Sequence, residues 1–165
     1  ISLSKKKNSS LSRAALKIIG NIMKTDAFYF NYFLSNDIVP IIISKFQDES
    51  KLKTKFEAAS IMASIVMNGT IEQQILSVQS DFIHYFLETA SIDIEKFVAT
   101  AIPPLMKLLE LGTTNPEFTY IWGLFDEEDG FQIITDLSYS ADDTIAHNII
   151  SVIDDIIRMR ESLEQ

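Results

Sequence analysis

Apolar residues recur along this chain at every third or fourth position, which is the spacing of an α-helix with one buried face. In the stretch KFEAASIMASIVMNG, residues 55 to 69, small and apolar side chains form a stripe that ends at a glycine. No segment shows the sustained two-residue alternation that is typical of a half-buried β-strand. The pattern therefore predicts a protein that is helical throughout.

The helical pattern repeats along the chain. A shift of the sequence by 43 places aligns Ala15 with Ala58, and a second such shift aligns Ala58 with Ala101. Each unit reads as one long helix, a loop and two shorter helices, which is typical of armadillo and HEAT repeats. We therefore expect an all-α, right-handed armadillo/HEAT-like α-solenoid segment of about three to four repeats. Because the first unit lacks its two opening helices, residues 1–165 are predicted to form a single armadillo-repeat domain, the C-terminal fragment of a longer solenoid.

Capping residues indicate where the helices begin and end. Thr70 and Gln73 have the spacing of a capping box, directly after Gly69, at which the preceding long helix should end. Other residues suited to helix starts are Asp26, Asp37 (with Pro40 in the first turn), Asp81, and Ser140 with Asp143. A third long helix is expected over about residues 94 to 111, ending at Gly112.

Three features of the apolar pattern need a structural explanation. Pro103 and Pro104 lie inside the third long helix and remove two N–H donors, so we expect that helix to bend or break. The stretch DAFYFNYFLSND, residues 26 to 37, holds five aromatic residues, most of which should fill space between repeats. An exposed ring there would instead make a partner site. Trp122, the sole tryptophan, is expected in the core or at an interface.

Composition and charge narrow the classes of function. The chain has no cysteine, which excludes disulfides and thiol chemistry and favours a reducing compartment inside the cell. No apolar run reaches the roughly 18 residues that span a bilayer, so no membrane partner is expected. Residues 1–60 hold ten Lys and Arg against five Asp and Glu, whereas residues 61–165 hold four against eighteen. The acidic surface argues against nucleic-acid binding, and the run Lys5 to Lys7 is interpreted as a solvated tail.

Nothing in the sequence predicts catalysis or a cofactor. His84 and His147 lack partners at metal-ligand spacing. The stretch DEEDG, residues 126 to 130, would place Phe125 where a calcium loop needs an acidic ligand. Adjacent carboxylates such as Asp142 and Asp143 point about 100° apart on a helix, which favours capping over acid–base chemistry. The protein is not expected to be an enzyme.

Three stretches together resemble the C-terminal armadillo repeats of the importin-α family. They are ALKIIGNI at 15–22, KFEAASIMASIVMNGTIEQ at 55–73 and EEDGFQIITDLSYSADDTIAHNIISVIDDI at 127–156. The resemblance spans about residues 11 to 157 and rests on order and spacing. It implies an armadillo fold whose third helices line a concave groove for nuclear-localisation-signal peptides.

In that family a Trp and an Asn four residues later hold the peptide, with carboxylates nearby. The corresponding positions here are Lys17 with Asn21, Ser60 with Ser64, and Pro103 with Lys107, and Glu57 stands at a groove-carboxylate position. Only Asn21 keeps the family's residue. Ser60 is unable to stack on a lysine stem, Ser64 is too short to reach across a groove, and Lys107 would repel a basic peptide. The resemblance therefore implies a peptide groove that is degenerate in this segment.

These features support two hypotheses about the function. The resemblance implies a nuclear-import adaptor that binds basic signal peptides of cargo proteins and shuttles between cytoplasm and nucleus. It also implies contact with the export receptor that recycles the adaptor, and with an importin-β-type receptor in the intact protein. The alternative is an armadillo scaffold that binds a folded or helical partner without signal-peptide recognition, which the missing Trp and Asn pairs favour.

Overall fold

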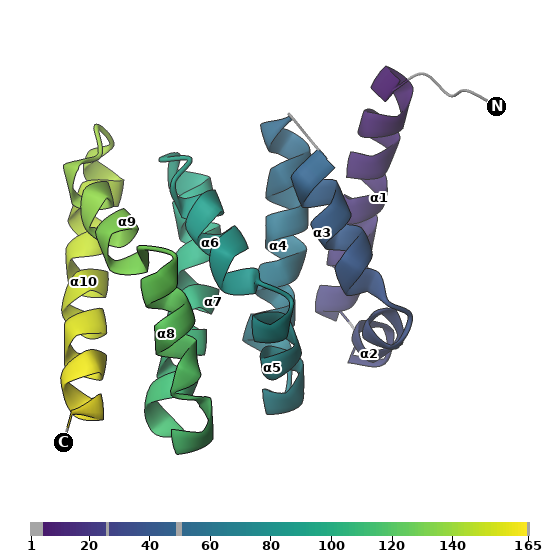
Figure 1. Ribbon diagram of the computed structural model, residues 1–165. Coiled ribbons are helices and arrows are strands. Elements are labelled where there is room, and N and C mark those ends of the chain that lie inside the picture. The colour runs from purple at the N-terminus through teal and green to yellow at the C-terminus, as the bar shows by residue number, and fades with distance from the viewer. Residues whose placement is uncertain (1–4, 26, 49–50, 165) are drawn as a thin grey trace. The chain divides into compact units, whose positions relative to one another are not determined.

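The computed structural model describes residues 5–25, 27–48 and 51–164 (Figure 1). Within these ranges the chain forms ten α-helices and two short 3₁₀ turns, and no strand occurs. The prediction of an all-α, solenoid-like fold is confirmed. The chain divides into two compact units, residues 1–68 and 69–165. None of the described helices is both long and apolar enough to cross a bilayer.

The first unit consists of four helices. They are α1 (Lys5–Thr25), α2 (Ala27–Ser35), α3 (Ile38–Asp48) and α4 (Leu52–Asn68). The long helices α1 and α4 pack against each other, α3 packs on α4, and α2 packs on α1. Gly20 allows the close approach of α1 to α4, because a Cβ atom there would lie 3.2 Å from the Ile61 side chain. Phe46 and Ile42 of α3 are fully buried in the core of this unit.

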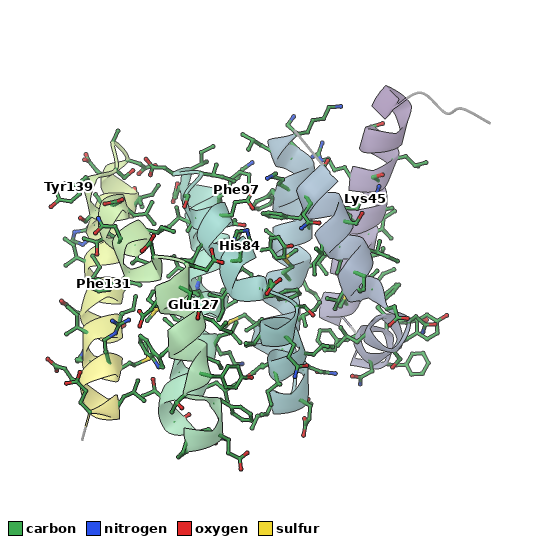
Figure 2. The ribbon with its side chains drawn as sticks, in the orientation of Figure 1. Lys45, His84, Phe97, Glu127, Phe131 and Tyr139 are labelled. Carbon is green, nitrogen blue, oxygen red and sulfur yellow. The ribbon has the colours of Figure 1, made fainter. Side chains whose placement is uncertain are left out.

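The second unit consists of six helices and the two 3₁₀ turns. The helices are α5 (Ile71–Gln79), α6 (Phe82–Ala90), α7 (Glu95–Thr114), α8 (Tyr120–Glu127), α9 (Gly130–Asp136) and α10 (Asp143–Leu163), and the turns are Pro116–Phe118 and Leu137–Tyr139. The helix α7 packs against α6, α8 and α10. Phe97 of α7 is buried, whereas Tyr139, in the turn before α10, is 84% exposed (Figure 2).

The order of one long helix followed by two short ones agrees with the prediction. The four long helices α1, α4, α7 and α10 have 21, 17, 20 and 21 residues. The Thr70–Gln73 capping box is present, because the Gln73 N–H donates to Thr70 Oγ1 and the Thr70 N–H donates to Gln73 Oε1. As expected, α4 ends directly before Gly69.

Other caps differ from the expectation. Asp81 precedes α6, but its backbone is left-handed (φ 60°) and its side chain makes no capping hydrogen bond. The helix α10 is capped by Asp142 rather than by Ser140, because Asp142 Oδ1 accepts from the Thr144 N–H at 2.9 Å. Ser140 is instead bonded to Asp93. The predicted cap at Asp26 lies outside the described residues.

The helix α7 continues past both positions at which an interruption was expected, the two prolines and Gly112. A bend or a break was expected at Pro103 and Pro104, and the break is absent, because α7 remains one α-helix from Glu95 to Thr114 with both prolines inside it. Burial of the flanking residues Ala101 and Leu105 holds the segment in place. Gly112 lies within the helix rather than at its end. A Cβ atom there would lie 3.1 Å from Ile121 Cβ, so this glycine serves the packing of α7 on α8.

The aromatic residues of α2 are mostly exposed, which contradicts the expectation that they fill the space between repeats. Phe28, Tyr29 and Tyr32 are 69%, 47% and 54% exposed, and Phe30 is buried. A nine-residue helix that packs through one face covers only the residues of that face.

Trp122 lies in the core as predicted. Its exposed fraction is 5%, and its indole N–H donates to Thr113 Oγ1 at 3.1 Å. The Arg160 guanidinium lies 5.2 Å from the centre of the Trp122 ring and forms an ion pair with Asp126. These two contacts join the end of α10 to α8.

Candidate functional site

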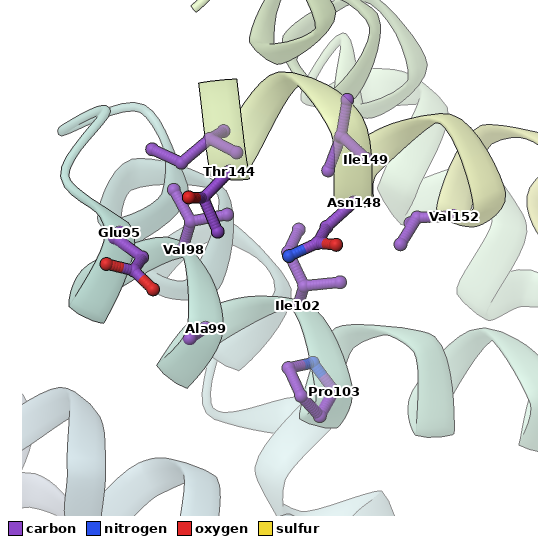
Figure 3. Close-up of a pocket in the computed structure, with 10 residues that line it drawn as sticks. Glu95, Val98, Ala99, Ile102, Pro103, Thr144, Asn148, Ile149 and Val152 are labelled. Atoms are coloured by element: carbon purple, nitrogen blue, oxygen red, sulfur yellow. The ribbon is translucent and has the colours of Figure 1, made fainter. Parts of the chain in front are cut away.

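The candidate site is a groove between α7 and α10 in the second unit (Figure 3). It encloses about 250 Å³. Its lining, which defines the α7–α10 groove, consists of Glu95, Val98, Ala99, Ile102 and Pro103 from α7, and Thr144, Ile145, Asn148, Ile149 and Val152 from α10. Most of these side chains are aliphatic, so the floor of the groove is apolar.

Helical periodicity positions these residues. Val98 and Ile102 are four residues apart on α7, and Ile145 and Ile149 are four residues apart on α10, so each pair lies on one side of its helix. Both pairs are buried where α7 and α10 pack together. Asn148 immediately precedes Ile149 and is therefore carried to the edge of this contact. Figure 3 shows its amide reaching from α10 toward α7 above Ile102.

The rim of the groove is rich in hydrogen-bond acceptors. Glu95 is exposed in the first turn of α7, and the Asn148 amide supplies a carbonyl oxygen as well as a donor. A third acceptor comes from the backbone. Because Pro103 has no N–H, the carbonyl of Ala99 lacks its usual donor four residues ahead in the helix.

A hydrogen bond between two loops fixes one end of the groove. The Ser140 hydroxyl donates to Asp93 Oδ1 at 2.6 Å, which joins the loop before α7 to the loop before α10. The lining of the groove contains one carboxylate, Glu95, in the first turn of α7. An apolar floor beside a negative rim suits a side chain with an aliphatic stem and a cationic head, such as lysine or arginine.

The predicted peptide-binding residues of the first unit lie on two helices. Lys17 and Asn21 are exposed and one turn apart on α1. Glu57 lies on α4, its side chain is 16% exposed, and the Arg13 guanidinium lies 3.7 Å from it. The negative charge that was expected to attract a basic peptide is therefore balanced by a cation of this chain.

The remaining predicted residues are less accessible. Ser64 is buried, and its hydroxyl donates to the Ser60 carbonyl at 2.9 Å within α4. Ser60 itself is half-buried. Lys107 lies on α7, one turn beyond Pro103 and outside the groove lining, and it is half-buried. Peptide binding stays a prediction for all six residues, which are Lys17, Asn21, Glu57, Ser60, Ser64 and Lys107.

Sequence reasoning missed Glu95 and Asn148. The 43-residue repeat places Ala146, and not Asn148, at the position that corresponds to Pro103. The repeat therefore did not identify Asn148, two residues further on, as a groove residue. The signal that was present is the position of Asn148 next to the apolar pair Ile145 and Ile149 on the last long helix.

Other polar groups of the described chain have structural roles. No cluster of histidine and carboxylate side chains suited to a metal ion occurs among the described residues. His84 Nδ1 lies 2.8 Å from Glu128 Oε2, which links α6 to the end of α8. The pKa of Glu72 is lowered chiefly by a hydrogen bond from the Thr70 side chain, with a smaller effect of its own backbone N–H. That carboxylate belongs to the cap of α5 and not to the groove.

No family model and no curated protein matches this chain significantly. A functional assignment therefore rests on the geometry of the groove and on the sequence pattern.

Proposed function

We propose that this chain is a peptide-binding segment of a nuclear-transport adaptor of the importin-α type, and that the α7–α10 groove receives a basic side chain of an extended peptide. The observation that supports the proposal is the pairing of an apolar floor with carboxylate, amide and carbonyl acceptors in one groove. The aliphatic stem of a lysine or arginine would lie along Val98 and Ile102, and its charged head would reach Glu95.

The electrostatics of the second unit favour a cationic ligand. Residues 69–165 contain eighteen Asp and Glu against four Lys and Arg. A field of this sign raises the rate at which a basic peptide meets the groove more than it raises the final affinity. The Asn148 amide, which offers both a donor and an acceptor, would bind the backbone of the extended peptide.

The wider role follows from the family resemblance. An adaptor of this type would carry proteins with basic signal peptides, exchange between cytoplasm and nucleus, and contact its export receptor and an importin-β-type receptor. Binding of a lysine-rich signal peptide is the part of this role that the groove supports directly.

A fluorescent lysine-rich signal peptide titrated into the protein at low and moderate salt tests the proposal. We expect saturable binding that weakens about fivefold in Glu95→Gln, because an exposed ion pair contributes about 1 kcal/mol. Asn148→Ala should weaken binding by a similar factor, since a neutral hydrogen bond contributes about 1 kcal/mol.

Glu110→Gln is the matched control. It removes the same charge from the same helix at an exposed position outside the groove lining. Binding should stay within about twofold of the unmodified protein, because a remote surface charge changes only the screened general field. Equal losses in Glu95→Gln and Glu110→Gln, or no saturable binding, would contradict a site in this groove.

The exposed aromatic residues of α2 favour a second candidate function, a scaffold that binds a folded partner. Phe28 and Tyr29 are in edge-to-face contact, and with Tyr32 they present aromatic surface to solvent. Surfaces of this composition are enriched at protein interfaces. The triple variant Phe28→Ser, Tyr29→Ser, Tyr32→Ser separates the two functions, since it should leave signal-peptide binding unchanged and abolish capture of a folded partner.

A further inference from the structure

An apolar stripe on α10 is left exposed in the described part of the chain. The stripe consists of Ala146, Ile150, Ile153 and Ile157, spaced by four, three and four residues and therefore aligned on one side of the helix. Ile150 is 54% exposed and Ile157 is 41% exposed. The stripe lies about 100° around the helix from Ile145 and Ile149, which pack toward α7. Large apolar residues gathered on one exposed face indicate an interaction surface.

A hollow adjoins the C-terminal part of this stripe. It has a volume of about 170 Å³ and is lined in part by Phe131, Ile157 and Arg160. Its floor is suited to one aliphatic side chain from another helix.

The helix α1 carries a second exposed stripe with the same spacing. It consists of Leu11, Ala15, Ile18 and Ile22. Leu11 is 69% exposed and Ile18 is 59% exposed. Leu16 and Gly20, which are buried on the side of α1 that approaches α4, lie about 130° and about 170° away around the helix. The helices α1 and α10 therefore each expose an apolar stripe away from the long helix on which they already pack.

The two stripes belong to units of opposite charge. Residues 1–68 contain ten Lys and Arg against five Asp and Glu, a net charge of +5, and residues 69–165 contain four against eighteen, a net charge of −14. Two copies that met through like units would bring charges of the same sign together. Contact between the first unit of one copy and the second unit of another is favoured by charge complementarity.

We propose that the occupant of these stripes is a second copy of this chain, with the α10 stripe of one copy packed on the α1 stripe of the next. Such a contact is heterologous, because different surfaces of the two copies meet, and heterologous contacts give either closed rings or open chains of copies. The groove face of α10, with Thr144 and Asn148, points away from the stripe, so association is independent of the proposed peptide binding.

Sedimentation velocity of the 165-residue chain over a wide range of concentrations tests the proposal. We expect the mean mass to rise with concentration above that of the monomer, and to rise less at high salt because attraction between oppositely charged units is screened. A chain that stays monomeric at every concentration would overturn the proposal.

Two variants with one altered stripe each give the sharper test. The first is Leu11→Glu with Ile18→Glu on α1, and the second is Ile150→Lys with Ile157→Lys on α10. All four positions are exposed and the new residues are good helix formers, so folding should be retained and is checked by circular dichroism. Each variant alone should be monomeric, and an equimolar mixture should form a one-to-one complex and nothing larger, because each variant retains the stripe that the other lacks.

A matched control completes the test, and three outcomes would decide against the proposal. Ile41→Glu, at another exposed isoleucine of the first unit, should assemble like the unmodified chain. Dimers of either double variant alone would show contact between like stripes. A mixture that stays monomeric, or an equal loss of assembly in Ile41→Glu, would place the contact elsewhere.

Discussion

The Ser140 hydroxyl donates a hydrogen bond to Asp93 Oδ1 at 2.6 Å and thereby joins the two loops that lead into α7 and α10. The residues are far apart in sequence, and their contact sets the separation of the helix starts that carry Glu95 and Thr144. A groove that binds an extended peptide needs such a fixed width, because ordering its walls on binding would cost conformational entropy.

Replacement of Ser140 by alanine should destabilise the protein and loosen the groove. We expect a loss of about 1 kcal/mol in the free energy of unfolding, the contribution of one hydrogen bond to a charged group at a partly exposed site. Signal-peptide binding should weaken in parallel. Denaturant titration and peptide titration of the same variant measure the two effects. Ser138→Ala is the control, because the Ser138 hydroxyl donates to the nearby Thr135 carbonyl and does not join the two loops.

Replacement of Pro103 by alanine should change stability and binding in opposite directions. Alanine restores an N–H within α7 that bonds the Ala99 carbonyl, so the free energy of unfolding should rise by about 1 to 3 kcal/mol. The same bond withdraws an acceptor from the groove, and peptide affinity should fall. Thermal unfolding and peptide titration are the two measurements. A variant that gains stability and keeps full affinity would show that the Ala99 carbonyl does not contact the peptide.

Two glycines of the second unit should respond oppositely to alanine. A Cβ atom at Gly130 would collide with the fully buried ring of Phe125, whereas one at Gly123 would meet nothing within 4 Å. Gly130→Ala should therefore destabilise the protein by about 1 to 3 kcal/mol through overpacking. Gly123→Ala should stabilise it by up to about 1 kcal/mol, since alanine is the better helix former. Denaturant unfolding of both variants gives the comparison, and equal effects would contradict the packing of α9 on α8.

The cap of α5 should contribute stability that depends on pH. Because the pKa of Glu72 is lowered in the folded protein, its stabilising effect is present above the pKa of the unfolded chain and is lost as pH falls through the folded pKa. Thr70→Ala removes the main cause, so the pKa of Glu72 should return toward its ordinary value of 4.5. NMR titration of the Glu72 side chain in both proteins measures the shift. The variant should also lose about 1 kcal/mol of stability, because an N-cap hydrogen bond is removed.

Local signals in the sequence predicted the helices well. The Thr70 and Gln73 capping box and the three- and four-residue spacing of apolar positions act within a few turns of one helix, so they can be read without the fold. The break expected at Pro103 and Pro104 did not occur, because packing on the neighbouring helices outweighs the local cost of two prolines.

Features that depend on which helices meet were not predictable from the sequence. Five aromatic residues in one short segment indicate a buried helix, yet only tertiary packing decides that Phe30 is covered while Phe28 is exposed. Glu95 and Asn148 line one groove only because α7 packs against α10. The likeness to importin-α predicts peptide-binding roles for Asn21 and Glu57, whereas the Arg13 partner of Glu57 appears only in the fold.

Chemical-shift mapping with a lysine-rich signal peptide and isotopically labelled protein tests the central claim most directly. A peptide in the α7–α10 groove should perturb the amide signals of Glu95, Ile102 and Asn148, and Glu95→Gln should reduce these shifts at equal peptide concentration. Shifts confined to the first unit, around Lys17 and Asn21, or no specific shifts at all, would contradict a peptide site in the groove.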